Sequence, residues 1–313
     1  MRRPRRPAFF VYAEEKKTRA MAISAEQVKK LRDQTGAGMM DCKAALTEAN
    51  GNAEEAVTVL RKRGLASAAR KAGRAASEGL IGHRVSADHS SGTLVEVNCE
   101  SDFVARTDDF QQLMHDVLTE IEKKGDAAPE DVTAWLKDPN GPIQPRVALA
   151  IGKLGENMAV PRFVRYVVQG GQGYVGQYIH LGGKIGVQVE LSGVTPAVTS
   201  REEFTTLVKE IAMQIAAASP GYVSRGAIPA EVLEKERSIY RAQMESSGKP
   251  AHVLDKIIEG KLGSFYQQVV LPDQASIRDP KMTVADVLAA ASKTLGAQVT
   301  VTRFARLKVG ETL

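Results

Sequence analysis

The chain has 313 residues, of which 43% are hydrophobic, 25% are charged and only 13 are proline. These values are typical of a globular protein with two or three domains and disfavour a largely disordered or fibrous chain. No run of apolar residues approaches the roughly 18 that a membrane-spanning helix needs. We therefore expect no membrane-spanning helix. Two cysteines, Cys42 and Cys99, are too few for a disulfide framework or a structural zinc. We expect both to be small buried side chains in a reducing, cytoplasmic setting.

The net charge of +5 lies in residues 1–20, which hold seven Lys/Arg and two Glu. Residues 21–313 therefore sum to zero, which argues against binding of nucleic acid through a basic face and leaves only a local patch open. Residues 1–20 lack the apolar core of a secretory signal, and they are neither serine-rich nor poor in acids as a transit peptide would be. Because a well-capped helix follows Met21, we expect translation to start there and residues 1–20 to be a disordered extension or a start-site artefact.

Residues 21–64 are predicted to form three short helices. Ser24 and Gln27 form a capping box before the first helix. Apolar residues at helical spacing give the inner faces of the three helices: Val28, Leu31, Cys42, Ala45, Leu46, Ala49, Ala56, Val57 and Leu60. We expect the third helix to end at Gly64, and residues 65–78 to form a fourth helix or a helical linker. A domain of roughly 40 residues has a marginal core and is more typical of docking than of chemistry.

Met39 and Met40 stand at the entrance to the second of these helices. Only one of two adjacent side chains can easily face the core, so the other is a candidate contact with a partner, methionine being adaptable at binding surfaces. The alternative, in which both methionines fill the core, stays open.

An internal repeat organises the rest of the chain. An offset of 94 places Gly79 on Gly173 and aligns two segments without a gap, each with two β-rich runs before a helix. The helical spacing of apolar residues recurs in both copies: 110, 113, 114, 117, 118 and 121 match Phe204, Leu207, Val208, Ile211, Ala212 and Ile215. We infer a duplicated α+β unit, a hairpin followed by a helix.

The repeat also argues against a nucleotide-binding motif. Residues 171–176 (GQGYVG) fit G-x-G-x-x-G, but a dinucleotide site needs that loop to open a helix, and the matching segment of the first copy predicts a strand. There is no phosphate-binding G-x-x-x-x-G-K-[ST] loop. The five histidines show no H-x-x-x-H pair, and no G-x-S-x-G serine is present. We therefore expect no bound nucleotide cofactor, no metal site and no catalytic residue for acyl transfer.

Two further segments complete the chain. Residues 125–165 are interpreted as a connector punctuated by Pro and Gly, which contains Trp135. A helix from Pro229, a turn at residues 246–250 and a second helix predict an antiparallel helical hairpin, whose apolar stripe packs on itself or meets a partner. The segment 299–307 is predicted to return as a strand to the second subdomain.

The two copies differ most after their β-rich runs. Asp102 and Phe103 in the first copy have no counterparts in the second. They are predicted to lie in a loop between strand and helix, where the large aromatic side chain either folds back on its own core or projects. A projecting Phe beside an acid is a wedge whose burial in a partner would contribute roughly 1.5 to 3 kcal/mol.

At these residues the sequence resembles a known family. Thr35 to Leu46 (TGAGMMDCKAAL) and Glu96 to Ala105 (EVNCESDFVA) are similar to bacterial members of the elongation factor Ts family, and the order of elements agrees from Met21 nearly to the end. The resemblance implies an α+β fold in several parts: a ubiquitin-associated-like three-helix domain at 21–64, a linker at 65–78, core subdomains at 79–170 and at 171–227 with 268–313, and a coiled-coil hairpin at 228–267.

The resemblance also implies a function and its residues. Members are guanine nucleotide exchange factors for elongation factor Tu, whose GTPase domain is entered by a T-D-F-V segment that dislodges Mg²⁺. Here the segment is Ser101, Asp102, Phe103 and Val104, and serine keeps the hydroxyl of the usual threonine. The family's N-terminal domain contacts the same GTPase domain, which would assign Met39 and Met40 to the interface, and His180 matches a histidine that serves the exchange contact in some members.

The chain departs from the family pattern at both ends. It stops at Leu313 soon after the last predicted strand, without the extra C-terminal helix of some members, and residues 1–20 have no family counterpart. A homodimer through the helical hairpin stays open. The competing function is that of a non-catalytic adaptor, which holds partners through its helical module and hairpin without altering nucleotide affinity.

Overall fold

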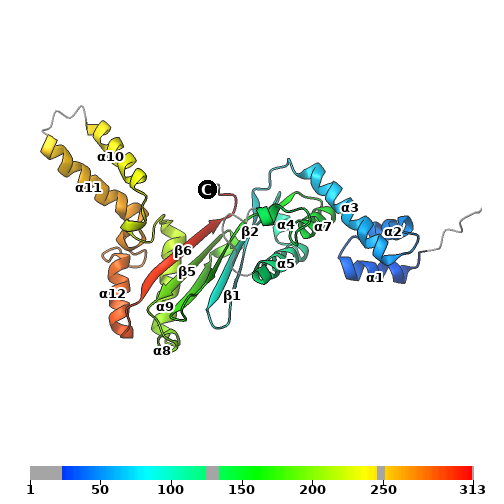
Figure 1. Ribbon diagram of the computed structural model, residues 1–313, viewed down its shortest axis with the longest axis horizontal. Coiled ribbons are helices and arrows are strands. Elements are labelled where there is room, and N and C mark those ends of the chain that lie inside the picture. Colours follow the sequence, from blue (N-terminus) through cyan, green and yellow to red (C-terminus); the bar gives the residue numbers. More distant parts are fainter. Residues whose placement is uncertain (1–22, 125–133, 245–250, 312–313) are drawn as a thin grey trace, which may run out of the picture. The chain divides into compact units, whose positions relative to one another are not determined.

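The protein, seen in a computed structural model, has an α+β architecture and is described over residues 23–124, 134–244 and 251–311 (Figure 1). The predicted extension at 1–20 and the predicted turn at 246–250 lie outside these ranges. The chain divides into two compact units, with the boundary between Arg63 and Gly64. Each unit is described by itself below.

The first unit is built from α1 (Ala25–Thr35), α2 (Met39–Glu48) and most of α3 (Ala53–Lys71). The predicted capping box is confirmed, since the Ser24 hydroxyl accepts from Gln27 N and the Gln27 side chain accepts from Ser24 N. Gly36 ends α1 with a left-handed φ of 68°. The predicted inner faces meet in one small core, whose buried members are Val28, Leu31, Cys42, Ala45, Leu46, Ala49, Ala56 and Leu60.

The third helix does not end at Gly64, as predicted, but continues to Lys71 and includes much of the expected linker. The glycine has a packing role: a Cβ at Gly64 would lie 3.1 Å from the carbonyl oxygen of Ala148. The missing side chain thus lets α3 approach α7 (Gln144–Leu154) backbone to backbone. Gly64, which was predicted to end the helix, is instead a position where two helices lie in close contact.

The second unit contains two three-stranded antiparallel sheets. The first has the order β1 (Glu78–Val85), β2 (Ser91–Cys99), β3 (Met158–Val167), and the second has the order β4 (Gly173–Ile179), β5 (Ile185–Ser192), β6 (Thr300–Lys308). The predicted strand at Gly173 and the predicted return of the C-terminal segment are both confirmed. The assignment of 125–165 as a connector is wrong in its second half, which forms α7 and most of β3.

Short and long helices complete each half of this unit. An offset of 94 carries α4 (Asp102–Ala105) onto α8 (Pro196–Thr199) and α5 (Asp108–Lys124) onto α9 (Glu202–Ala218). An offset of 141 carries α7 onto α12 (Val284–Leu295) and Gly155 onto Gly296, which ends α12 as Gly155 ends α7. This unit also contains short 3-10 helices, η1 (Leu181–Gly183), η2 (Arg225–Ala227) and η4 (Leu271–Asp273).

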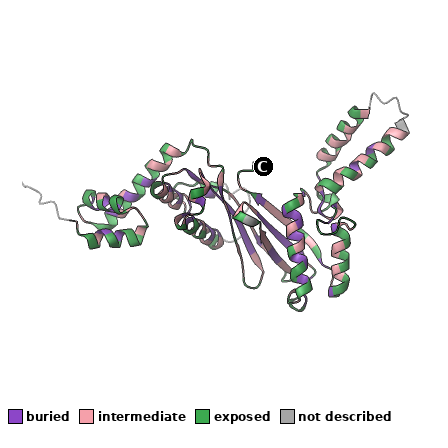
Figure 2. Ribbon diagram, turned by 180° about the vertical axis from the view of Figure 1, so that it is seen from behind, coloured by how far each residue is buried: buried purple, intermediate pink, exposed green. Residues whose placement is uncertain are grey.

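The two sheets lie face to face between two helical layers (Figure 1). On the outer faces, β2 packs against α5 and β5 packs against α9, each around a fully buried phenylalanine, Phe110 in one half and Phe204 in the other. Between the sheets lies a small apolar cluster of Ile81, Leu94 and Leu307. The central strands are therefore buried on both faces, as the purple strands in Figure 2 show.

Two buried carboxylates join the sheets in the same way from opposite sides. Glu96 Oε2 accepts from Arg162 Nε at 2.7 Å, and Arg162 donates on to the carbonyl of Lys308 in the other sheet at 3.0 Å. The offsets of 94 and 141 turn this pair into Glu190 and Arg303, 2.7 Å apart. Arg303 then donates to the carbonyl of Val167 in the first sheet at 3.1 Å. In each case the ion pair lies within one sheet, and the hydrogen bond from the arginine to a carbonyl group links the two halves.

The remaining helices form the inserted hairpin, α10 (Ala230–Met244) and α11 (Ala251–Val269), which pack against each other. Ile258 and Leu262 of α11 are buried, whereas α10 has no buried residue. Figure 2 shows the hairpin as mainly exposed and intermediate. Self-packing therefore accounts for only part of its apolar stripe.

Candidate functional site

The segment that follows β2 forms a helical turn, α4, and not the predicted loop. Ser101 caps this turn, because its hydroxyl accepts from Val104 N at 3.4 Å. Phe103, at the second position, is 80% exposed, the largest exposed fraction among the described large apolar side chains. The other exposed large apolar side chains of the described residues are Met39, Met40, Leu65, Ile239 and Ile277. Of the two predicted orientations of Phe103, the structure has the projecting one.

The neighbours of Phe103 explain this orientation. Val104 packs against the core of the first half, and Ala105 is buried there. Because three consecutive helical residues cannot all face the core, Phe103 points outward. Asp102 forms an ion pair with Arg106 at 2.7 Å, with the two side chains 41% and 77% exposed. An exposed pair of this kind contributes little to stability, so the Asp102 carboxylate stays accessible to a partner.

Side chains from the turn between α7 and β3 hold α4 in place. The carboxylate of Glu156 accepts from Glu100 N at 3.1 Å, from Ser101 N at 2.9 Å and from Ser101 Oγ at 2.6 Å. In return, the Glu100 carboxylate accepts from Asn157 N at 2.6 Å. Sequence reasoning missed Glu156 and Glu100, because their partners lie more than 50 residues away in the sequence. The one available signal was the comparison of the two copies at an offset of 141.

Cys99 closes the strand that leads into this turn. It is fully buried, as predicted for both cysteines, and its thiol donates to the carbonyl of Ser101 at 3.1 Å. Burial, and secondarily the negative charge of Glu156, raise the pKa of the Cys99 thiol to about 11. The thiol therefore stays protonated at neutral pH and acts as a hydrogen-bond donor, not as a nucleophile.

The second copy has a helical turn at the same place, but it lacks the acidic and aromatic side chains of α4. At the offset of 94, Pro196 and Ala197 of α8 stand where Asp102 and Phe103 stand in α4. Thr195, the counterpart of Ser101, makes no side-chain cap. Ala297, which follows Gly296 as Glu156 follows Gly155, has no carboxylate to offer. The duplication thus supplies the backbone twice and the exposed aromatic side chain once.

His180 lies at the turn between β4 and β5. Its side chain is exposed, and its Nδ1 lies 3.0 Å from the hydroxyl oxygen of Tyr178. The turn that follows uses Gly182 and Gly183 at left-handed φ values of 81° and 71°. A single tyrosine thus orients the histidine ring.

The structure brings the His180 turn and α4 to the same end of the sheets. Lys184 Nζ, just after the turn, contacts the carboxylate of Glu78 and donates to the carbonyl of Gly79 at 2.9 Å. Glu78 pairs with Cys99 in the β1–β2 register, and Cys99 leads into Ser101. Two of the three predicted contact regions therefore share one edge of the duplicated core.

The third region, Met39 and Met40, lies in the first unit, and both side chains face outward, 59% and 74% exposed. The prediction that only one of them is exposed is wrong, and so is the alternative that both fill the core. The reason lies in α2: its core face begins at Cys42, one turn further on, so the first two positions of the helix extend past the core. Both methionines are available to a partner.

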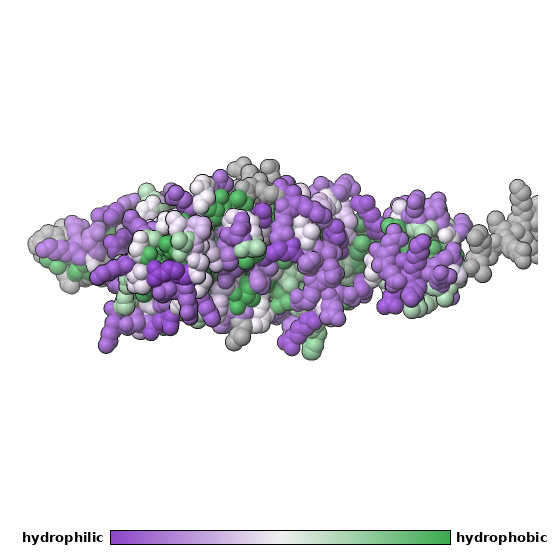
Figure 3. Space-filling model, turned by 90° about the horizontal axis from the view of Figure 1, so that it is seen from below, coloured by the Kyte–Doolittle hydropathy of each residue, from purple (hydrophilic) through white to green (hydrophobic). Residues whose placement is uncertain are grey.

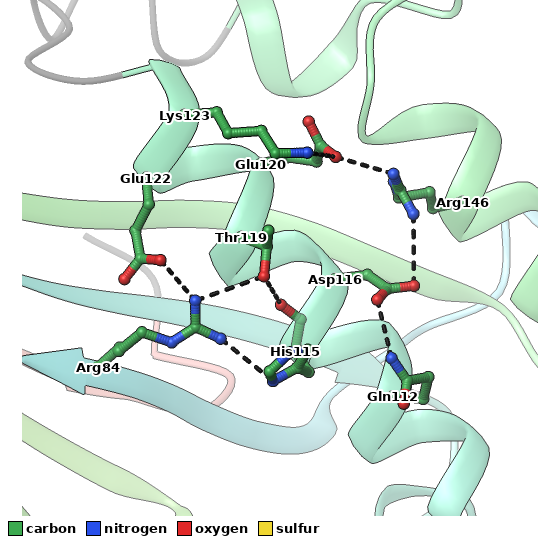
Figure 4. Close-up of polar contacts among 9 residues, drawn as sticks. All are labelled: Arg84, Gln112, His115, Asp116, Thr119, Glu120, Glu122, Lys123 and Arg146. Atoms are coloured by element: carbon green, nitrogen blue, oxygen red, sulfur yellow. Dashed lines mark hydrogen bonds and ion pairs between the residues drawn. The ribbon is translucent and has the colours of Figure 1, made fainter.

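A polar network fixes α5, the helix that follows α4 (Figure 4). Arg84 of β1 contacts the carboxylate of Glu122, Thr119 Oγ1 and His115 Nδ1. Arg146 of α7 bridges Asp116 at 3.4 Å and Glu120 at 2.8 Å. These contacts attach α5 to a strand on one side and to a helix on the other.

The described chain offers little for a cofactor or a metal. Nowhere in residues 23–124, 134–244 and 251–311 do three or more His, Cys, Asp or Glu side chains gather as a metal site requires. The G-x-G-x-x-G match runs into β4 and opens no helix. None of the described helices has the length and hydrophobicity of a membrane span. On the face drawn in Figure 3, hydrophobic side chains form small patches separated by hydrophilic ones.

Comparisons with known proteins show which family the sequence is similar to. The family model described as elongation factor TS matches residues 100–311. A relative from Trichlorobacter lovleyi, named elongation factor Ts, is 44% identical over 94% of this chain and 94% of its own length. Proteins of the same name from Nitratiruptor sp. and Aquifex aeolicus are 45% and 43% identical, each over 93% of this chain, and over 94% and 99% of their own lengths.

Proposed function

The chain belongs to the elongation factor Ts family, and we propose on this basis that it is the guanine nucleotide exchange factor for elongation factor Tu in translation elongation. It binds the GTPase in the cytoplasm, dislodges Mg²⁺ and promotes release of GDP so that GTP can bind. No covalent bond is made or broken, so the protein is not an enzyme in the chemical sense, and it uses no cofactor of its own.

The single observation that carries this proposal is the exposed Phe103 on a turn that is capped and held from behind. An isolated protein gains nothing from a phenylalanine that is 80% exposed. Burial of this ring in a partner would contribute roughly 1.5 to 3 kcal/mol. Because α4 is fixed to its scaffold, little conformational freedom is lost when the ring enters the partner.

Exchange follows from thermodynamic coupling. A protein that binds the nucleotide-free GTPase more tightly than the GDP-bound form must weaken GDP binding by the same factor. Entry of Phe103, with Asp102 beside it, would displace the groups that hold Mg²⁺, and the cation neutralises the charge of the phosphate oxygens that it bridges. Loss of the cation therefore weakens the hold on GDP.

Three further residues are proposed to contact elongation factor Tu. His180 is supported by its exposure at the same edge of the core as α4, and Met39 and Met40 by the exposure of two large apolar side chains on a small helical unit. Methionine adapts its shape to a partner surface at low cost. Ser101 contributes as the cap of α4, and Val104 as its anchor in the core.

The proposal is tested by measuring the affinity of the protein for elongation factor Tu twice, once without nucleotide and once at saturating GDP. We expect GDP to weaken binding at least tenfold, and the protein to weaken GDP binding by the same factor. Equal affinity in the two conditions would overturn the exchange function.

Equal affinity would instead favour the second candidate function, that of an adaptor. One observation supports it: α10 has no buried residue, and its Ile239 is 38% exposed, so the hairpin has an apolar face to offer. A second copy of the chain is the simplest occupant of that face, which gives a homodimer. Light scattering of the protein and of an Ile239→Glu variant tests this: a dimer that becomes a monomer in the variant supports it, and a monomeric wild type contradicts it.

A further inference from the structure

The carboxylate of Glu156 faces three donors at the start of α4. Two are backbone amides, Glu100 N and Ser101 N, and one is the hydroxyl of Ser101. We infer that Glu156 is a positioning residue for nucleotide exchange, which holds α4 so that Phe103 is presented in one orientation. This inference rests on the proposed exchange function.

The chemistry of the contact favours a carboxylate. All three groups around it donate, and a carboxylate has acceptor sites only, so it satisfies them together. An amide could accept from the two backbone N–H groups through its oxygen, but its NH₂ group would then face the Ser101 hydroxyl and reverse that hydrogen bond. Hydrogen bonds to an ionised acceptor are also shorter and stronger than neutral ones, as the distance of 2.6 Å to Ser101 Oγ indicates.

The contact acts on α4 through its cap. Ser101 uses its hydroxyl twice: it donates to Glu156 and accepts from Val104 N. The carboxylate therefore fixes the rotamer that lets Ser101 cap the turn, and a four-residue turn has little other local support. Without Glu156, the cap and the two amides lose their common partner, and the direction of Phe103 is no longer set.

Glu156 is itself held in place. It follows Gly155, which ends α7 at a left-handed φ of 80°, and its neighbour Asn157 donates its backbone N–H to the Glu100 carboxylate. The two segments therefore bind each other reciprocally, with one glutamate from each side. These hydrogen bonds attach the start of α4 to the segment between α7 and β3, and so restrain its position.

The second copy is an internal control for this inference. It has the helical turn and the glycine, but alanine stands in place of both Phe103 and Glu156, as Ala197 and Ala297. Gly193 of that copy lies so close to the carbonyl oxygen of Gln298 that a Cβ would be 2.0 Å away, so the backbone there closes without a side-chain link. The carboxylate is thus dispensable for the fold of the turn and occurs in the copy that carries the aromatic side chain.

The experiment compares Glu156→Gln with wild type in stimulated release of a fluorescent GDP from elongation factor Tu, in the presence and absence of Phe103→Ala. The matched control is Asp286→Asn, because the Asp286 carboxylate at the start of α12 also accepts from a backbone N–H and a hydroxyl, both of Thr283. Unfolding by urea measures the stability of every variant.

We expect Glu156→Gln to lower the maximal rate of stimulated release about tenfold, the factor that corresponds to one charge-assisted hydrogen bond. In the Phe103→Ala background it should cause no further loss, since a positioning residue acts only through the group that it positions. The control variant Asp286→Asn should stimulate release of GDP from elongation factor Tu at the wild-type rate. A purely structural role would instead lower the rate equally in both backgrounds.

Two results would overturn the inference while the exchange function stands: wild-type rates in Glu156→Gln, or equal losses with and without Phe103. If Glu156→Gln does not fold, Ser101→Ala removes one donor of the contact and is judged by the same comparison. A wild-type protein that does not accelerate release at all would overturn the exchange function itself, and the inference with it.

Discussion

The two halves of the duplicated core differ where one of them presents a side chain to the outside. Both have a three-stranded sheet, a short helical turn and a long helix around a buried phenylalanine, and both send an arginine across to the other sheet. Only the first half carries Phe103 and Glu156, for which the second has Ala197 and Ala297. Residues that the halves share therefore serve stability, and residues that separate them are candidates for function.

The largest expected effect is on the free energy of unfolding, and it comes from the buried phenylalanine that both halves share. Phe110 and Phe204 are both fully buried at equivalent positions, so Phe110→Ala and Phe204→Ala should each lower the free energy of unfolding by about 3 to 5 kcal/mol. Urea unfolding followed by circular dichroism measures both. A decrease in the free energy of unfolding of less than about 1 kcal/mol in either variant would contradict the expectation that the two cores are equivalent.

The two ion pairs whose arginines reach across to the other sheet should give the next largest effect, with a difference between the halves. Glu96→Gln should cost about 3 kcal/mol, because Glu96 and Arg162 are only 2% and 15% exposed. Glu190→Gln should cost about 1 kcal/mol, since its partner Arg303 is 44% exposed and partly hydrated. Glu96 also accepts from Gly310 N at 2.8 Å, which adds to its expected cost. The same urea experiment compares the two variants, and equal costs would contradict the expected difference.

Much of this architecture is predictable from the sequence, because buried positions repeat with the period of a helix. The inner faces of α5 and α9 and the capping box at Ser24 follow directly from residue spacing. Strand β3 escaped prediction because Pro161 interrupts its pattern. The proline is tolerated since β3 is an edge strand and its register with β2 shifts at this point.

The candidate site is less predictable than the fold. Phe103 stands out as a difference between the copies, but its direction was left open by the sequence and is decided by the packing of Val104 and the burial of Ala105. Glu156 escaped because the hairpin α10–α11 enlarges the second copy, so an offset of 94 no longer aligns the third strands. Contacts between distant segments depend on the fold and leave no local pattern.

Cys99 provides a smaller, pH-dependent difference, since Gly193 replaces it in the second half. The folded protein raises the thiol pKa from an ordinary 9.0 to about 11, so the unfolded chain loses this proton first. The free energy of unfolding should therefore fall by up to about 2 kcal/mol as the pH rises from about 9 to about 11. Cys99→Ala should show a flatter pH profile than wild type, and parallel profiles would contradict the assignment.

The smallest expected effect on stability lies outside the duplicated core. Met39→Ala and Met40→Ala should change the free energy of unfolding by less than about 0.5 kcal/mol, because both side chains are exposed. Each should weaken binding to elongation factor Tu by about fivefold, or about 1 kcal/mol. Calorimetric titration measures this, and unchanged affinity in the double variant would remove these residues from the interface.

We propose that one exposed aromatic side chain, Phe103, which is present in only one copy, accelerates nucleotide release. The most direct test is stopped-flow release of fluorescent GDP from elongation factor Tu with wild type, Phe103→Ala and the control Ile277→Ala, an exposed apolar residue of the second half. We predict that Phe103→Ala folds normally and slows stimulated release at least about tenfold, whereas Ile277→Ala matches wild type. Equal acceleration by wild type and Phe103→Ala would contradict it.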